Sequence, residues 1–270
     1  MPRVKLTLAY HGAGFVGWQY QENGLSVQET VERALAPLLG AEGAGVRVHG
    51  SGRTDSGVHA VGQVAHFDAP ETRRGFPWQR ALNSRLPRTV CVVEAEEVAD
   101  DFHARFDVLR KTYAYTLWLE RRYVHPQRRE FVWDCGPLDL AAMDEAALYF
   151  LGEHDFAAFR NAGGDTQGTV REILTLERGP GHSPLECVWR VTATGFLKQM
   201  VRNIVGCLVA VGQGKVRPDF VRSLLDEGDR TLAPQTAPAR GLCLERVEYP
   251  PSPSGGSARD EHQMGSEQPD

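Results

Sequence analysis

Apolar and polar residues alternate in the first segment of the chain, VKLTLAY at residues 4–10, so that Val4, Leu6 and Leu8 share one face. This period of two is typical of a strand with one buried face. Similar segments, bounded by polar or glycine-rich stretches, recur along the whole chain. The pattern predicts strands at residues 4–10, 46–49, 61–68, 91–98, 111–119, 171–178, 186–194 and 243–249.

Helical spacing occurs in five places between these strands. The clearest case starts at Ser26, which forms a capping box with Glu29, and it ends at Gly40. The longest helix is expected at residues 195–211, with an apolar face and further valines beside it, more apolar surface than one sheet should need. The remaining helices are expected from near Pro77, from Asp139 to about Leu151, and from Pro218 to Leu225.

Strands and helices alternate in both halves of the chain, which favours two α+β sub-domains whose sheets join. We expect an N-terminal sub-domain at residues 1–105 and a C-terminal one at 106–250, although no sequence repeat marks a duplication. Residues 251–270 are rich in serine, glycine, proline and acidic residues. That composition predicts a disordered acidic tail.

The formal net charge of −5 counts by itself against a nucleic-acid partner. The predicted tail supplies −3 of that charge, and 26 of the 30 basic residues are arginines. Arginine binds phosphates with a planar fork and stacks on bases. The total charge therefore leaves an RNA partner open.

The chain lacks the sequence features that are typical of membrane, secreted and metal-binding proteins. No apolar run approaches the ~20 residues of a membrane span, and the N-terminus shows no signal-peptide pattern. The five cysteines are scattered and never form a CxxC pair, which favours free buried thiols in a reducing cytoplasm. His59, His66 and His103 lack metal-ligand spacing. We therefore expect a cytoplasmic protein without metal or cofactor.

The stretch GSGRTDSGVHA, residues 50–60, is the strongest candidate for chemistry. Its three glycines allow a sharply folded backbone and the close approach of a ligand beside Arg53, Thr54 and Asp55. Asp55 could be a catalytic carboxylate on a rigid turn, or it could cap the turn with its own side chain. Composition alone favours the cap and leaves catalysis as the alternative.

Part of this stretch, GRTDSGVHA, resembles the signature loop of the TruA family of tRNA pseudouridine synthases. Four other stretches resemble motifs of that family in the expected order, so that the resemblance spans residues 4 to about 249. They are YHGAGFVGWQYQ at residues 10–21, DFHARFDVLRKTYAY at 101–115, GFLKQMVRNIVG at 195–206 and APARGLCL at 237–244.

The resemblance implies roles for single residues. Asp55 is then the essential catalytic residue, Arg53 holds the target nucleotide out of its stack, and Arg202 pairs with Asp55. Tyr113 packs on the target uracil and is a candidate for proton transfer. The expected substrate-binding set is completed by Lys111 and by Leu244, which lines the base pocket.

Two of these residues also have a plain structural interpretation. Tyr113 and Tyr115 fall on one strand face, where a pair of aromatic residues is more often core than ligand contact. Arg202 in an otherwise apolar helix needs a buried partner, and Asp55 would serve. The positive charge of Arg202 would also stabilise the ionised carboxylate of Asp55.

The resemblance also implies a fold and an activity. The expected fold is the pseudouridine synthase fold: two RRM- or ferredoxin-like α+β halves joined into one large, mainly antiparallel sheet flanked by helices. The expected enzyme is a homodimer that acts on tRNA. It converts uridine to pseudouridine at positions 38, 39 and/or 40 of the anticodon stem-loop.

The required chemistry suits these residue types. Pseudouridine forms when the N1–C1′ bond breaks, the base rotates and C5 joins C1′. A carboxylate can start this reaction by attacking C1′ or by taking a proton from C2′, and both routes stay open. The rival functions are a non-catalytic RNA-binding module and a small-substrate glycosidase. A glycosidase normally needs two carboxylates, and the Asp55 loop supplies one.

Overall fold

The computed structural model describes residues 1–40, 45–163 and 168–251. Residues 252–270, nearly all of the predicted tail, lie outside the described residues, so the predicted disorder stays a prediction. Within the described ranges, no helix has the length and apolar character needed to cross a membrane.

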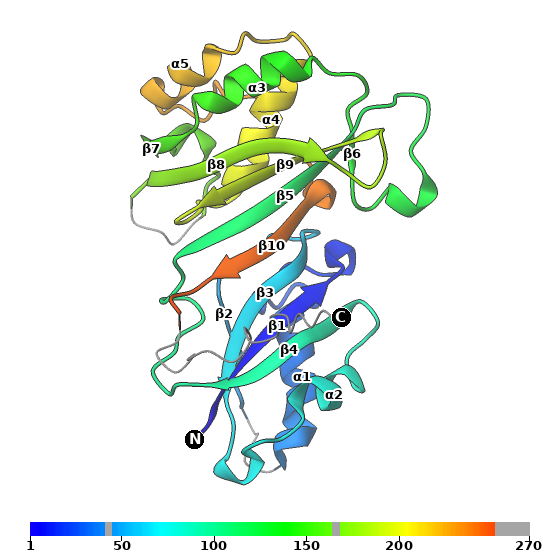
Figure 1. Cartoon of the computed structure of the whole chain (residues 1–270), viewed down its shortest axis with the longest axis vertical. Coiled ribbons are helices and arrows are strands. Elements are labelled where there is room, and N and C mark those ends of the chain that lie inside the picture. The colour runs from blue at the N-terminus through cyan, green and yellow to red at the C-terminus, as the bar shows by residue number, and fades with distance from the viewer. Residues whose placement is uncertain (41–44, 164–167, 252–270) are drawn as a thin grey trace, which may run out of the picture.

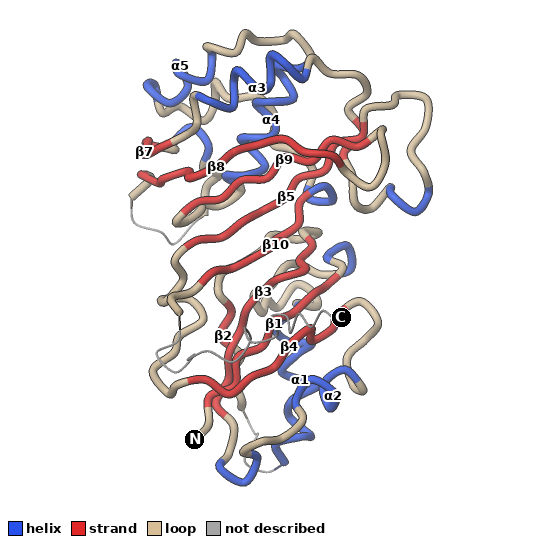
Figure 2. The backbone as a smooth tube through the Cα atoms, viewed as in Figure 1, coloured by secondary structure: helices blue, strands red, loops and turns tan. Residues whose placement is uncertain are grey.

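The described residues contain ten strands that join in one sheet running the length of the molecule (Figures 1 and 2). The strands are β1 Arg3–Tyr10, β2 His49–Gly50, β3 His59–Asp68, β4 Val90–Val98, β5 Arg110–Trp118, β6 Trp133–Asp134, β7 Gly152–Asp155, β8 Val170–Pro180, β9 Glu186–Ala193 and β10 Leu242–Glu248. Their order is β4–β1–β3–β10–β5–β9–β8–β7, with β2 beside β3 and β6 beside β5.

Helices flank both ends of this sheet. Figure 1 shows α1 and α2 beside β1 and β4, and α3, α4 and α5 gathered at the β7–β8 end. The helices are α1 Val27–Leu39, α2 Trp78–Asn83, α3 Leu140–Leu148, α4 Met200–Gly212 and α5 Phe220–Glu227. Three short 3₁₀ turns bear on the site: η1 Gly12–Gly14, η4 Pro126–Arg128 and η6 Ala239–Gly241.

β1 and α1 follow directly from local sequence. Val4, Leu6 and Leu8 are fully buried, while the intervening side chains of β1 are only partly so, as the alternation predicts. Ser26 accepts a hydrogen bond from the backbone N–H of Glu29, which satisfies one of the free donors at the start of α1. The predicted N-cap is therefore confirmed.

The two halves of the sheet are joined by a short parallel strand pair. β10, the last strand in sequence, lies between β3 and β5, and it pairs with β3 only at Cys243–His59 and Leu244–Ala60. Apart from the β5–β6 pair, the other strand pairs of the described residues are antiparallel. The predicted α+β class with one large, mainly antiparallel sheet is confirmed. The division at residues 105 and 106 stays a prediction.

Two predicted elements begin later than expected. The strand predicted at 46–49 is reduced to β2, which pairs with β3 at His66 and Ala65. The helix predicted from Gly195 begins at Met200, because Gln199 adopts a left-handed conformation with φ 61°. Apolar residues at helical spacing continue upstream of that point, which is why periodicity alone placed the start too early.

The valines beside the main stripe of α4 are not surplus surface. Val201, Val205 and Val209 are at most 4% exposed, because neighbouring parts of the same chain, including α3, cover the helix. The interpretation of these valines as excess apolar surface is wrong. The expectation that all five cysteines are buried is wrong as well, since Cys91 is exposed on β4.

Candidate active site

A row of side chains crosses the centre of the sheet, where its two halves are joined. Tyr10 of β1 pairs with Ala60 of β3, Ala60 with Leu244 of β10, and Leu244 with Tyr113 of β5. Directly opposed residues of neighbouring strands point to the same face. The two residues expected to hold the base, Leu244 and Tyr113, are therefore cross-strand neighbours.

The loop that carries Asp55 lies on this same face. The hydroxyls of Tyr10 and Thr54 are hydrogen bonded at 2.9 Å, and the N–H of Trp18 donates to the Thr54 carbonyl at 3.1 Å. Gly17 has φ +111°, and a Cβ there would lie 2.5 Å from the Thr54 carbonyl oxygen. A glycine is therefore required where the turn around residues 11–17 packs against the Asp55 loop.

A buried glutamine holds the start of the loop. The Gln63 amide accepts from the Ser51 hydroxyl at 2.7 Å and donates to the Gly52 carbonyl at 3.0 Å. Gln63 is fully buried on β3. Sequence reasoning missed this residue, although an amide side chain within the predicted strand at residues 61–68 was the available signal.

Arg202 reaches Asp55 from the first turn of α4. Its Nη1 lies 3.3 Å from Asp55 Oδ2, and its Nε donates to the Ala237 carbonyl at 2.7 Å. The side chains of Arg202 and Asp55 are 15% and 28% exposed, so the pair is shielded while the carboxylate stays accessible. The second contact fixes the guanidinium, which explains how one arginine can orient the carboxylate.

Tyr113 and Tyr115 differ although they share a strand face. Tyr115 is fully buried and donates to the Pro238 carbonyl, which makes it a core residue. Tyr113 is 8% exposed and packs edge-on against Phe196, and its hydroxyl has no hydrogen-bond partner among the described residues. Burial, with contributions from Tyr10 and Asp55, raises the pKa of Tyr113, so its hydroxyl carries a proton at neutral pH.

Lys111 lies two residues before Tyr113, on the same face of β5. Its ammonium donates to the Ser51 carbonyl at 2.6 Å, at the entrance of the Asp55 loop. A Cβ on Gly52 would lie 2.4 Å from Lys111 Nζ, so glycine leaves room for the ammonium. The structure thus brings Lys111 to the loop, Tyr113 and Leu244 to the central row, and Arg202 to Asp55. Arg53 is exposed, two residues before Asp55.

Comparison with known proteins identifies the family of this chain. The family model described as tRNA pseudouridine synthase matches residues 7–107 and 146–250. The chain belongs to the tRNA pseudouridine synthase family. The tRNA pseudouridine synthase A of Maridesulfovibrio salexigens is 53% identical over 258 residues, which cover 96% of this chain and 94% of that protein. The protein of the same name from Solidesulfovibrio magneticus is 56% identical over 254 residues, covering 92% of each chain.

Membership of this family confirms the resemblance carried by the five motifs and the prediction of an isomerase. The matched segments contain Asp55, Arg202 and Leu244. Tyr113 and Lys111 fall between the two matched segments. No group of three or more His, Cys, Asp or Glu residues able to hold a metal ion occurs among the described residues.

Raising the pH from 8 to 10 is expected to stabilise the wild-type synthase relative to Lys111→Met by about 2 kcal/mol. Burial, with a smaller effect of Arg105, lowers the pKa of Lys111 to about 8, below its ordinary value of 10.5. The unfolded chain therefore binds more protons in this range, and the free energy of unfolding rises with pH. Urea denaturation of both proteins at each pH measures the difference.

The matched control is Lys215→Met, because Lys215 is exposed. We expect this variant and the wild type to have parallel pH dependences. Parallel dependences for Lys111→Met and the wild type would show that Lys111 is not a buried ammonium in the folded protein.

Proposed function

We propose that this enzyme converts uridine to pseudouridine in the anticodon stem-loop of tRNA, at positions 38, 39 and/or 40, with Asp55 as its catalytic carboxylate. The observation that carries the proposal is the Asp55–Arg202 pair, held at 3.3 Å over the face formed by Tyr113 and Leu244. Family membership supports the reaction class.

Each residue has a task in this scheme. Asp55 attacks C1′ or takes the C2′ proton, and Arg202 holds its carboxylate in place. The electron pair of the broken N1–C1′ bond stays on the uracil, and the freed base rotates between the Tyr113 ring and Leu244, which enclose it. C5 then bonds to C1′ while the Asp55–C1′ bond breaks or, in the other route, while Asp55 returns its proton to C2′. The proton on C5 is then transferred to N1. In this scheme the protonated hydroxyl of Tyr113 takes part in this proton movement.

The two basic residues serve the substrate rather than the bond that breaks. Arg53 is exposed at the rim of the loop, where a guanidinium can fill the space left by the flipped uridine and offset a cost of a few kcal/mol. Lys111 lies further inside and holds the Ser51 carbonyl, so it positions the loop and adds positive charge close to the substrate backbone.

Pseudouridine mapping of bulk tRNA incubated with the purified protein, without added metal or nucleotide, tests the function. We expect new pseudouridine at one or more of positions 38, 39 and 40. Tight tRNA binding without any pseudouridine would instead identify a non-catalytic RNA-binding module.

The resemblance to the TruA family also supports a cytoplasmic homodimer. Two arginine-rich faces related by a two-fold axis would give a tRNA a longer groove than one chain provides. Light scattering at micromolar concentration is expected to give about twice the chain mass of 29.9 kDa. A monomer with full activity on tRNA would contradict the dimer.

A further inference from the structure

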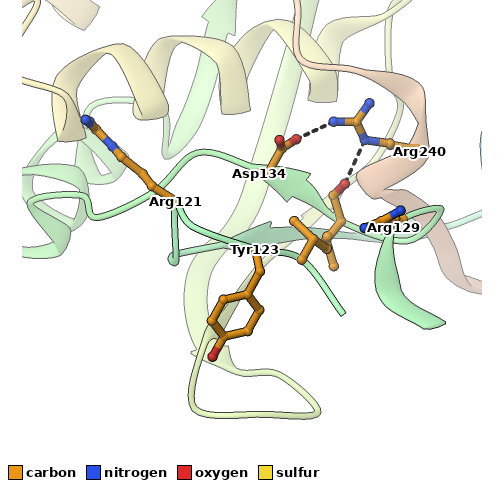
Figure 3. A pocket seen from close by; sticks show the side chains of 7 residues that line it. Arg121, Tyr123, Arg129, Asp134 and Arg240 are labelled. Atoms are coloured by element: carbon orange, nitrogen blue, oxygen red, sulfur yellow. Dashed lines mark hydrogen bonds and ion pairs between the residues drawn. The ribbon is translucent and has the colours of Figure 1, made fainter. Parts of the chain in front are cut away.

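A basic pocket lies outside the Asp55 face, largely in the segment that connects β5 to β6. Its volume is about 370 Å³, within the range of small-ligand sites. It is lined by Arg121, Tyr123, Val124, Arg129, Val132, Asp134 and Arg240 (Figure 3). Apart from Arg240, these residues belong to the stretch between the two segments that the family model matches.

The connecting segment is anchored at several points, so its side chains are held in place before any ligand arrives. The Trp118 indole donates to the Tyr123 carbonyl at 2.6 Å, and Arg128 binds Glu186, whose side chain is fully buried, at 2.6 Å. The His59 ring is hydrogen bonded to the Glu130 carbonyl at 2.8 Å. A pre-ordered site loses little freedom when a ligand binds.

The charges in the pocket favour an anion. Arg240 binds the Val132 carbonyl and Asp134, which neutralises the carboxylate of the pocket (Figure 3). Within the described residues, the guanidinium groups of Arg121 and Arg129 form no hydrogen bond or ion pair. Two unpaired arginines therefore remain, and arginine is the side chain best suited to grip a phosphate.

The rest of the lining suits a base. Tyr123 is 47% exposed, and Val124 and Val132 add an apolar wall. Aromatic rings and guanidinium planes are the surfaces on which unpaired RNA bases stack. The pocket therefore combines an arginine that can bind a phosphate with an aromatic ring on which a base can stack.

One short segment links this pocket to the catalytic loop. Ala237 accepts from Arg202, and the Cβ of Ala239 lies 3.2 Å from the Cβ position of Gly57 in the Asp55 loop. The next residue, Arg240, lines the pocket. Residues 237–240 therefore contact the Asp55 loop and its partner Arg202 and also line this pocket, so one RNA strand can reach both.

We propose that the pocket binds an unpaired nucleotide of the RNA substrate other than the target uridine, with its phosphate on Arg129 and its base on Tyr123. The proposal rests on the proposed function, since it assumes that the substrate is tRNA. It adds a subsite that fixes the RNA strand beside the catalytic loop.

Binding of a tRNA transcript to Arg129→Ala at several salt concentrations tests the proposal. We expect Kd to rise about tenfold near 0.1 M salt, and the slope of log K against log salt to fall by about 1, because one phosphate contact is lost. Tyr123→Leu should raise Kd by about tenfold with an unchanged slope, because stacking is not ionic. In both variants KM should rise while kcat stays within about twofold, since Asp55 is untouched.

Arg122→Ala is the matched control. Arg122 lies between Arg121 and Tyr123 in the sequence, and its side chain is 81% exposed. It is paired with Glu120 and does not line the pocket. Equal losses for Arg122→Ala and Arg129→Ala would indicate a diffuse field and overturn the subsite, as would unchanged affinity in Arg129→Ala and Tyr123→Leu.

The remaining arms separate other occupants. Uridine 5′-monophosphate and inorganic phosphate are titrated alone; binding that is lost in Arg129→Ala while tRNA affinity is unchanged would assign the pocket to a free anion. If the pocket variants have a changed mass in light scattering but unchanged tRNA affinity, the occupant of the pocket is a second copy of the chain. Both outcomes overturn the proposal. Binding is measured without turnover, so a failure of pseudouridine formation does not affect this test.

Discussion

Replacing Asp55 by asparagine is expected to lower pseudouridine formation by more than about 10⁴-fold, because the variant has no carboxylate to attack C1′ or take the C2′ proton. The amide is nearly isosteric, and its oxygen can still accept from Arg202. tRNA affinity should stay within about threefold of wild type, since contacts to phosphates dominate binding. Single-turnover assays and filter binding measure the two effects separately.

Asp55→Glu is expected to fail as well, because one added methylene moves the carboxylate by more than a tight site tolerates. The matched control is Asp144→Asn, since Asp144 is also paired with an arginine, Arg178, but lies on α3 away from the site. That variant should keep full activity. Turnover by Asp55→Asn at a wild-type rate would remove the basis of the mechanism.

Replacing Arg202 by alanine is expected to reduce kcat by about 100-fold, because the carboxylate of Asp55 then lacks the contact that orients it. Stability should fall by about 2 kcal/mol, because the change also removes the donor to the Ala237 carbonyl and leaves that oxygen without its bond. The pair is partly exposed, so the loss is smaller than for a fully buried ion pair. Urea denaturation and single-turnover kinetics are the measurements.

A double-mutant cycle tests whether the two residues act together. If Arg202 works through Asp55, the loss of activity in Asp55→Asn combined with Arg202→Ala should be no larger than in Asp55→Asn alone. Arg178→Ala removes the comparison ion pair with Asp144 and should leave kcat unchanged. An Arg202→Ala variant with wild-type kcat and stability would show that the pair has no role.

The position of the site within the fold explains why these effects are expected to be local. The Asp55 loop is held from three sides, by Gly17 and Tyr10, by Gln63, and by Arg202. Tyr10 belongs to β1 and Gly17 follows η1, whereas Gln63 lies on β3 and Arg202 on α4. A loop fixed by several elements keeps its backbone when one side chain changes, which is why the Asp55 variants should still bind tRNA.

Local signals in the sequence determined most of the elements and the catalytic candidate. The alternation of Val4, Leu6 and Leu8 requires only that neighbouring residues of a strand point to opposite faces, and a cap such as Ser26 acts within four residues. The motif around Asp55 likewise lies within one loop. Properties that depend on contiguous residues can be predicted without knowing what packs against them.

The sequence alone did not determine contacts between distant segments. The insertion of β10 between β3 and β5, the Gln63 hydrogen bonds and the pocket at Arg129 and Arg240 each join residues far apart in the chain. Periodicity carries no information about which strand lies next to which. Periodicity also placed the start of α4 too early. The helix begins only after Gln199, whose left-handed conformation the spacing of apolar residues does not reveal.

The same distinction holds for Arg202. Its type in an apolar helix predicted a buried partner, and the motif resemblance named Asp55, yet the 3.3 Å contact exists only because α4 and the Asp55 loop converge on one face of the sheet. The valines of α4 show the reverse case, since their burial within the chain could be decided only by the elements that cover the helix. Burial and pairing are properties of the folded chain, because a side chain is desolvated by segments that its own neighbourhood in sequence does not contain.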